Sequence, residues 1–319
     1  MKFNKPKFWD KKKPTIFSFL LLLLTIPLVI NNFLRQSKKH NNNSKNYTIK
    51  TICVGNIYLG GTGKTPSAIK ISQILNDLKY RTVFIKKNHS ETFDEEKLLK
   101  KYGKVLSYSK RENSLSEANK FYDVAIFDDG LQDNSINYNL KFVCFNTNIF
   151  IGNGMLIPAG PLREKINSLK KYDAVFLNGD AENMNDIITQ IKKYKKDIKI
   201  FKSEYNLINL NSFDKKEKYI AFAGIGFPKN FFKTLIYNNF NIVKFLEFPD
   251  HYNYNYKDIK KIIDISNDFN AKILTTEKDY ERIRASDSQN IDYIRYVKME
   301  LKIKEESELI DFIQKNLWV

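Results

Sequence analysis

The chain has 319 residues, of which 42% are hydrophobic, so it is long enough for two domains and for a sizeable core. Its formal net charge is +17, and the first fifty residues alone carry eleven Lys or Arg and one Asp. This charge flanks an apolar segment, which favours an anionic membrane surface over a nucleic acid, and no protein partner is implied. Cys53 and Cys144 fall in apolar, strand-like runs without a Cys-x-x-Cys pair, which indicates buried structural thiols and argues against a zinc site.

An uncharged run of twenty residues, 15–34, lies between basic segments near the start of the chain. A helix of that length would reach about 30 Å at ~1.5 Å per residue, enough to cross a bilayer core. Pro27 and the pair Asn31-Asn32 weaken a simple spanning interpretation. A signal peptide is the alternative, but no small-x-small cleavage site follows. We therefore expect a retained membrane anchor, and the basic residues on both sides leave open whether it crosses the bilayer or lies in the interface.

From residue 50 onward, short apolar runs alternate with helix-like segments. The runs are KTICVG, TVFIK, DVAIFDD, KFVCFN and DAVFLN, and after residue 205 come YIAFAGIG, FNIVKFLEF and AKILTTEKD. This alternation predicts a parallel α/β sheet covered by helices, and the fresh series after residue 205 predicts a second, smaller α/β domain. The expected domains are an anchor and linker (1–46), a core domain (47–205) and a C-terminal α/β domain (206–319).

The stretch GGTGKT lies between the first of these strands and a helix-like segment. Backbone N–H groups of a glycine-rich turn, together with a helix N-terminus, form a nest for phosphate oxygens. A lysine there would reach the terminal phosphates of a nucleotide, and the threonine hydroxyl after it would bind Mg²⁺. Tyr58 stands where the usual pattern has its first glycine, so the loop is a variant; a glycine-rich turn without nucleotide is the alternative. The expected nucleotide-binding residues are Gly60, Gly61, Thr62, Gly63, Lys64 and Thr65.

Three further segments carry candidate site residues. The strand DVAIFDDG ends in Asp128 and Asp129, as expected for the second Mg²⁺-handling element of a P-loop protein, or simply for solvated acids at a strand end. The Gly- and Pro-rich stretch GNGMLIPAGPLRE predicts a long structured loop. Its Arg163 would bind phosphate and its Glu164 would join the metal shell, unless the two form an ordinary exposed ion pair. FPDHYNY places an Asp-His pair, ending in His251, after a strand, which also fits a capped turn.

In this order, VGNIYLGGTGKTP, DDGLQ, GNGMLIPAGPLRE, FAGIGFPKNFF, FPDHYNY and TTEKDYERI resemble the tetraacyldisaccharide 4'-kinase (lipid A 4'-kinase) family over nearly the whole chain. The resemblance implies a P-loop NTPase-like parallel sheet domain and a second smaller α/β domain, joined by a two-stranded linker, with an N-terminal membrane-associated helix. It implies a kinase that uses ATP and Mg²⁺ to phosphorylate the 4'-hydroxyl of a lipid A disaccharide precursor. It also implies a place at the inner membrane, with the catalytic domains on the cytoplasmic side.

The resemblance also assigns roles to particular residues. Lys64, Arg163 and Mg²⁺ would stabilise the transferring phosphoryl group, with Thr65, Asp128, Asp129 and Glu164 handling the metal. The family's catalytic base lies in a Gly-Asp-Glu-Pro segment, for which FDEE is the nearest match, with Asp94 at the key place. His251 would orient or tune that base.

Two segments depart from the family pattern. The Ser-Arg-Gly-Tyr-Gly segment expected after the second strand is replaced by IKKNHSETF, and DDGLQH ends in Asp133 in place of His. Both changes bear on substrate contacts. Two rival functions therefore stay open: a membrane-tethered P-loop switch ATPase, which would not need GNGMLIPAGPLRE or FPDHYNY, and a degenerate relative that binds nucleotide or lipid without kinase activity.

Overall fold

The structure is a computed structural model that describes residues 5–37, 47–88, 93–286 and 290–318. The chain divides into two compact units. The first consists of Met1–Thr92, Leu99–Glu204 and Ile303–Val319, and the second of Phe93–Leu98 and Tyr205–Lys302. Residues 303–319 therefore belong to the first unit, whereas the sequence pattern placed all of 206–319 in one C-terminal domain.

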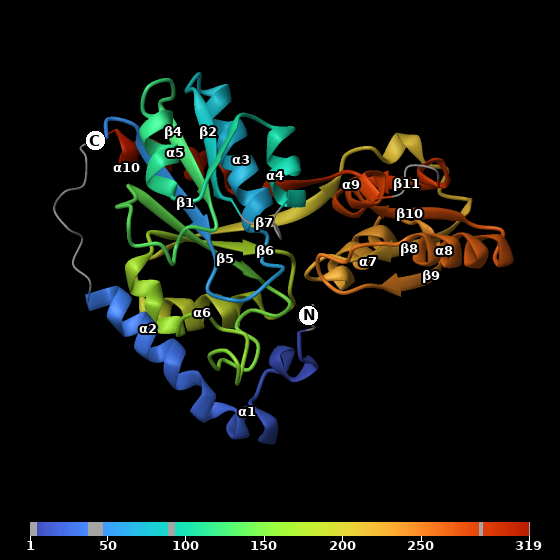
Figure 1. Cartoon of the computed structure of the whole chain (residues 1–319), viewed down its shortest axis with the longest axis horizontal. Helices are drawn as coiled ribbons and strands as arrows, with labels where there is room; N and C mark the ends of the chain where they lie inside the picture. Colours follow the sequence, from blue (N-terminus) through green and yellow to red (C-terminus); the bar gives the residue numbers. More distant parts are fainter. Residues whose placement is uncertain (1–4, 38–46, 89–92, 287–289, 319) are drawn as a thin grey trace. The chain divides into compact units, whose positions relative to one another are not determined.

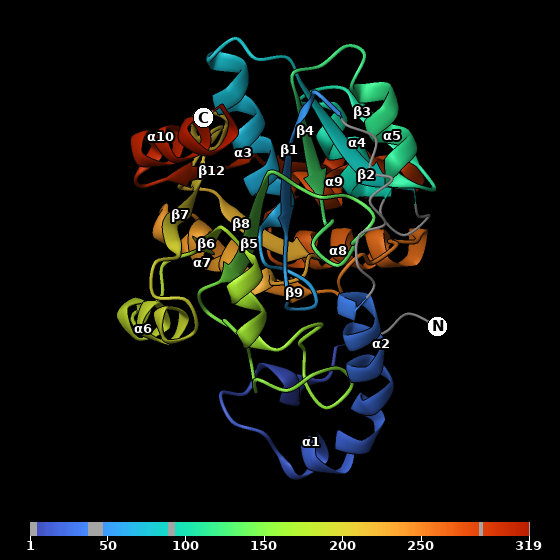
Figure 2. The same ribbon diagram turned by 90° about the vertical axis from the view of Figure 1, so that its left-hand side faces the viewer.

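The larger sheet has eight strands, counted over the described residues, in the order β12-β7-β6-β5-β1-β4-β2-β3 (Figure 1). All of them belong to the first unit except the end of β7 and most of β12, which fall in the second. Neighbours from β3 to β7 pair in parallel, and β1 and β4 lie side by side at the centre (Figure 2). The strands are β1 (Lys50–Gly55), β2 (Thr82–Lys87), β3 (Val105–Tyr108), β4 (Val124–Asp128), β5 (Leu140–Asn146), β6 (Ala174–Asn178), β7 (Lys199–Leu207) and β12 (Met299–Ile303).

Helices cover both faces of this sheet, which is why its central strands are apolar throughout. One face packs on α5 (Arg111–Ala118) and α6 (Met184–Tyr194), in a cluster that includes Val143 of β5. The next residue back, Phe142, points to the opposite face and lies 6.0 Å, ring centre to ring centre, from Phe312 of α10 (Glu306–Leu317). A salt bridge of 2.9 Å between Lys70 and Glu306 joins α10 to α3 (Lys64–Asp77).

The edge strand β12 and its neighbour β7 connect the two units. The backbone N–H of Ile208 donates to Lys298 and that of Lys304 donates to Lys202, so the two segments run in opposite directions. The chain leaves the first unit along β7 and returns along β12, which is why its last helix, α10, packs on the first sheet. This pair corresponds to the two-stranded linker that the family resemblance implies.

The N-terminal segment forms η1 (Lys7–Asp10), α1 (Ile16–Leu20), η2 (Leu22–Thr25) and α2 (Ile26–Ser37) rather than one helix over 15–34. Its inner side packs on the loop that contains GNGMLIPAGPLRE (Figures 1 and 2). Trp9 is fully buried and its indole N–H donates to the Pro158 carbonyl at 3.0 Å. Gly152, with φ of +56°, lets the Trp9 backbone approach the loop, because a Cβ there would lie 2.1 Å from the Trp9 carbonyl oxygen.

The outer side of the same segment is apolar and exposed. Within the described ranges, no helix combines the length and the apolar character needed to span a bilayer. The expected membrane-associated helix is therefore not confirmed as a spanning element. Among the described side chains of α1, η2 and α2, the large apolar ones that are at least 60% exposed are Ile16, Phe17, Phe19, Leu20, Leu23, Leu24 and Phe33.

The second unit has a four-stranded parallel sheet in the order β11-β10-β8-β9. Alternate residues of β8 face opposite sides, so that Tyr219 and Ala221 pack with α7 while Phe222 packs with α8 and α9. The α/β fold class expected from the sequence, with a large parallel sheet and a smaller one, is confirmed. The elements are β8 (Lys218–Ala223), α7 (Pro228–Tyr237), β9 (Asn241–Glu247), α8 (Tyr256–Asp268), β10 (Lys272–Thr276), α9 (Glu277–Ser286) and β11 (Ile294–Val297), with the first turns of α4 (Phe93–Lys100).

Candidate active site

The phosphate loop connects the central strand β1 to the N-terminus of α3. Gly60, Gly61 and Gly63 have φ of +91°, +42° and +82°, a region that side-chain-bearing residues rarely adopt. Lys64 and Thr65 are the first two residues of α3, and Pro66 stands in the first turn, where its missing N–H costs no helix hydrogen bond. The loop thus has the backbone of an anion-binding nest at a helix N-terminus.

Three asparagines brace this loop from below. Asn178, at the end of β6, donates to the Thr62 carbonyl at 2.6 Å, and Asn146, at the end of β5, donates to the Gly61 carbonyl at 3.2 Å. The Asn56 amide donates to the Thr62 hydroxyl at 2.8 Å. All three asparagines are buried, so these contacts are shielded from water and hold the loop in one shape.

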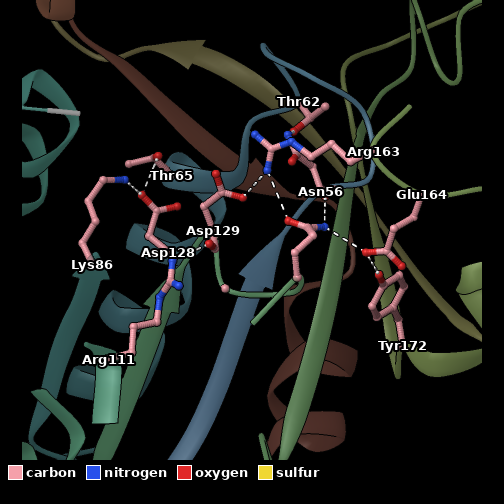
Figure 3. A network of polar contacts seen from close by, with 12 residues as sticks. Asn56, Thr62, Thr65, Lys86, Arg111, Asp128, Asp129, Arg163, Glu164 and Tyr172 are labelled. Atoms are coloured by element: carbon pink, nitrogen blue, oxygen red, sulfur yellow. Dashed lines mark hydrogen bonds and ion pairs between the residues drawn. The ribbon is translucent and has the colours of Figure 1, made fainter. Parts of the chain in front are cut away.

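Asp128 ends β4 beside the loop and is fully buried. Its Oδ2 accepts from the Thr65 hydroxyl at 3.0 Å and from Lys86 Nζ at 2.6 Å (Figure 3). Its Oδ1 is buried and has no hydrogen-bond partner within the described part of the chain. The structure therefore brings together the threonine and the aspartate that the sequence pattern assigned to the metal.

Asp129 follows at φ of +62°, an unusual conformation that turns its carboxylate away from β4. Arg163 Nη1 donates to Asp129 Oδ1 at 2.8 Å and to Gln132 Oε1 at 3.3 Å (Figure 3). Both members of this ion pair are about one quarter exposed. The arginine of the Gly- and Pro-rich loop is thus held at the acidic end of β4.

Glu164 is largely buried and belongs to the same network. Its Oε1 accepts from Gln132 Nε2 and from the Tyr172 hydroxyl, each at 3.1 Å, and Lys171 Nζ lies 3.7 Å from Oε2. Burial, followed by the neighbouring Glu164 carboxylate, raises the pKa of Tyr172 well above its ordinary value, so this tyrosine stays a donor. Arg163 and Glu164 are therefore not an exposed ion pair with each other, but two ends of one network.

Asp133, which replaces the family's His, pairs with Arg111 of α5. Arg111 Nη1 lies 2.8 Å from Asp133 Oδ2, and Arg111 Nη2 donates to the Asp129 carbonyl at 2.7 Å. Burial opposes ionisation of Asp133, but hydrogen bonds from Ser135 and Arg111 hold its pKa below the ordinary value. The departure in DDGLQD thus comes with an arginine that supports the backbone of the acidic turn.

The donor set fits Mg²⁺. In the described part of the chain no three His, Cys, Asp or Glu side chains cluster as an all-protein metal cage would require. Mg²⁺ in nucleotide sites instead uses one or two protein oxygens, and phosphate oxygens and water complete its shell. The Thr65 hydroxyl and the Asp128 carboxylate, with its unpartnered Oδ1, supply such oxygens. Asp129 and Glu164 lie further along the network and would act through Arg163, Gln132 or water.

The Asp-His pair lies in the second unit, between β9 and α8. His251 has φ of +55° and its backbone N–H donates to the Gly224 carbonyl at 3.1 Å. Below it, the buried Asp279 accepts from the Gly224 N–H at 3.1 Å and from the Tyr254 hydroxyl at 3.1 Å, which fixes the loop that carries His251. Burial raises the pKa of Asp279, although these hydrogen bonds and Arg282 oppose the rise.

Only the backbone of Asp94, in the first turn of α4, is described, and its side chain lies outside the described residues.

Hydrogen bonds and ion pairs within the first unit join the predicted site residues Thr65, Asp128, Asp129, Arg163 and Glu164 (Figure 3). The phosphate-loop glycines precede Thr65 in the chain. Sequence reasoning missed a set of neutral and basic partners. Several of them end neighbouring parallel strands, a position that predicts a site at the carboxyl edge of the sheet. The missed residues are Asn56, Lys86, Arg111, Gln132, Asn146, Tyr172 and Asn178.

Comparison with known proteins shows the family of the chain. The family model described as LpxK, tetraacyldisaccharide-1-P 4'-kinase, matches residues 17–101 and 85–317. A tetraacyldisaccharide 4'-kinase of Pelagibacter ubique is 49% identical over 97% of this chain and 96% of its own, and one of Rickettsia canadensis is 34% identical over 86% and 87%. A crystal structure of LpxK from Aquifex aeolicus in complex with ATP shares the fold, with a TM-score of 0.70, 21% identity and coverage of 95% of this chain and all of that one. The chain therefore belongs to the tetraacyldisaccharide-1-phosphate 4'-kinase family.

Proposed function

We propose that the protein transfers the γ-phosphoryl group of ATP to the 4'-hydroxyl of a tetraacyldisaccharide 1-phosphate, a precursor of lipid A. The observation that carries this proposal is the continuous network from Thr65 and Asp128 through Asp129 and Arg163 to Glu164, at the mouth of a phosphate loop. Phosphoryl transfer requires positioning and charge neutralisation more than covalent chemistry, and this network offers both.

Each residue of the site has a separate role in phosphoryl transfer. The phosphate-loop backbone and Lys64 would hold the β- and γ-phosphates, and Arg163 would stabilise charge that develops on the transferring group. Mg²⁺, held by Thr65 and Asp128 with Asp129 and Glu164 in support, would neutralise phosphate oxygens. Asp94 would accept the proton of the sugar hydroxyl, and His251 would orient or tune that carboxylate. Both belong to the second unit, which supports a shared role for them.

The membrane has a part in the same proposal. A lipid substrate stays in the bilayer, so the enzyme has to work at its surface. The exposed apolar side chains of α1 and η2, beside basic residues on both flanks, suit insertion into the headgroup region of an anionic membrane. We place the protein at the inner membrane, with its catalytic units on the cytoplasmic side, where ATP is available.

A kinase assay tests the function directly. Purified protein with ATP, Mg²⁺ and tetraacyldisaccharide 1-phosphate in mixed micelles should yield a product with one more phosphate, detected by mass spectrometry. ATP hydrolysis without lipid, and no lipid product, would favour the switch ATPase. Nucleotide or lipid binding without any turnover would favour the degenerate relative. The Arg163 and Glu164 network argues against both rivals, because neither needs an arginine held over the acidic strand end.

A further inference from the structure

Lys86 is a buried lysine outside the phosphate loop. It lies in β2, which pairs in parallel with β4 so that Ile85 is opposite Phe127, and the next residue of each strand is Lys86 and Asp128. The Lys86 side chain is 3% exposed and the Asp128 side chain is fully buried. Lys86 Nζ lies 2.6 Å from Asp128 Oδ2, a short, charge-assisted contact (Figure 3).

The Lys86 ammonium group lies next to the side chains that would bind the metal. The oxygen that accepts from Lys86 also accepts from the Thr65 hydroxyl, at 3.0 Å. Thr65 and Asp128 are the residues to which we assign Mg²⁺. A divalent cation and an ammonium group repel each other strongly at such separations in a buried site. The two cations therefore compete for one carboxylate.

Stability alone does not account for the lysine. A buried ion pair often stabilises a protein no more than an apolar pair of similar volume, because both charges lose their hydration. A carboxylate buried without any cation, however, is costly. A site that holds Mg²⁺ only while nucleotide is bound leaves its aspartate without the metal for the rest of the cycle, and a nearby lysine removes that cost.

We propose that Lys86 is a built-in counter-ion of the magnesium site. It neutralises Asp128 in the nucleotide-free enzyme and moves away from Asp128 Oδ2 when Mg²⁺ enters with ATP. This inference rests on the proposed function only in taking Thr65 and Asp128 as the metal-handling residues. Its consequence is a raised Mg²⁺ requirement, since each Mg²⁺ ion has to displace a resident positive charge.

Mg²⁺ titration of nucleotide binding tests the proposal without any turnover. Full-length protein in detergent is mixed with a fixed concentration of a non-hydrolysable ATP analogue. The melting temperature of the protein is then measured at increasing concentrations of Mg²⁺. In Lys86→Gln, which keeps a hydrogen-bond donor but loses the charge, the half-effective Mg²⁺ concentration should fall by at least about tenfold. Lys87→Gln is the matched control, because the next residue of a strand points to the opposite face and should leave the Mg²⁺ requirement unchanged.

Other outcomes would overturn the counter-ion role. One such outcome is an unchanged or higher Mg²⁺ requirement in Lys86→Gln. Another is an equal loss of affinity for the ATP analogue with and without Mg²⁺, because this result would indicate that Lys86 contacts the phosphates. If Lys86→Gln does not fold, Lys86→Gln/Asp128→Asn removes both charges; recovery of folding there supports neutralisation of Asp128, and continued failure to fold contradicts it. A shifted Mg²⁺ requirement in an enzyme that never phosphorylates the lipid would reject the proposed function and leave this inference standing.

Discussion

Arg163 Nη1 lies 2.8 Å from Asp129 Oδ1, and this contact joins the Gly- and Pro-rich loop of the first unit to the acidic end of its central strand β4. Asp129 has a left-handed backbone, with φ of +62°, and the Arg111 guanidinium holds its carbonyl at 2.7 Å. Backbone strain of this kind persists only where the surroundings hold it in place, and it is common at functional sites. The pair is therefore the best place to begin testing the site.

Replacing Arg163 by Ala should lower kcat about 10²–10³-fold, the usual cost of removing one group that stabilises transition-state charge. Steady-state kinetics with the lipid substrate would measure it. Arg81→Ala is the matched control, because Arg81 forms an ion pair with Asp123 at the same 2.8 Å but is 67% exposed. Such surface pairs contribute little, so Arg81→Ala should keep full activity. Equal activity of the two variants would remove Arg163 from the mechanism.

Lys64→Ala and Asp129→Asn should both abolish turnover, by different routes. Lys64, at the start of α3, acts on phosphates, so its loss should weaken the binding of ATP or its alignment. Asp129 supports the Mg²⁺ site, so its replacement should change the dependence of activity on Mg²⁺ concentration. Calorimetric binding of ATP and a Mg²⁺ titration of the rate distinguish the two effects. Full activity in Lys64→Ala would contradict the phosphate-loop assignment, and full activity in Asp129→Asn would contradict the metal role of Asp129.

Most of the fold could be predicted because buried parallel strands are continuous apolar runs. The strands β1, β4 and β6 lie within the stretches expected from the sequence, and β2 and β5 each extend one residue beyond theirs. The strands β7 and β12, which connect the two units, could not be predicted in this way. β7, with the sequence KIFKSEYNL, alternates between buried and exposed side chains, and the sequence pattern suggested a domain boundary within it.

Only the site residues that lie in a recognisable sequence motif could be predicted. The phosphate loop, Asp128 and Arg163 stood in recognisable stretches, but the partners of these residues depend on which strands become neighbours. Nothing in TVFIKK shows that β2 lies beside β4, and so nothing in it points from Lys86 to Asp128. The break of 15–34 into α1, η2 and α2 likewise comes with tertiary contacts to the Gly- and Pro-rich loop: Asn153 donates to the Ser18 hydroxyl at 3.0 Å, and Asn32 donates to the Arg163 carbonyl at 2.9 Å.

The two sides of the N-terminal segment should respond differently to substitution. Trp9→Ala should reduce the free energy of unfolding by about 3–5 kcal/mol, because the buried indole fills space beside Pro158. The triple variant Phe17→Gln/Leu20→Gln/Leu23→Gln should change stability little, because these side chains are at least 67% exposed. Its partitioning into anionic vesicles, measured by sedimentation, should fall more than about tenfold. Unchanged partitioning would place the membrane contact elsewhere.

The two cysteines should be unreactive in the folded protein. Both are buried free thiols. Burial raises the pKa of Cys144 to about 12 and that of Cys53 beyond its usual range. The thiolate is the reactive form, and these raised pKa values keep both thiols protonated at pH 8. An aromatic disulfide reagent should therefore label the protein only after denaturant is added, when two thiols per chain should react. Rapid labelling of the native protein would contradict this structural role.

Asp94 and His251 should behave as one catalytic pair. Asp94 lies in the first turn of α4, which clusters with the second unit, and His251 lies on a loop of that unit held by Gly224 and Asp279. A general base contributes typically about 10²–10⁴-fold, so Asp94→Asn should lower kcat by that order while the KM for ATP changes little. The double variant with His251→Ala should be little worse than the worse single variant, because residues that act as a unit are not additive. Glu95→Gln is the matched control: this neighbouring carboxylate is buried and 3.6 Å from Lys278 Nζ, so its loss should cost stability rather than kcat of the folded enzyme. A loss of kcat in Glu95→Gln with full activity in Asp94→Asn would move the base by one residue.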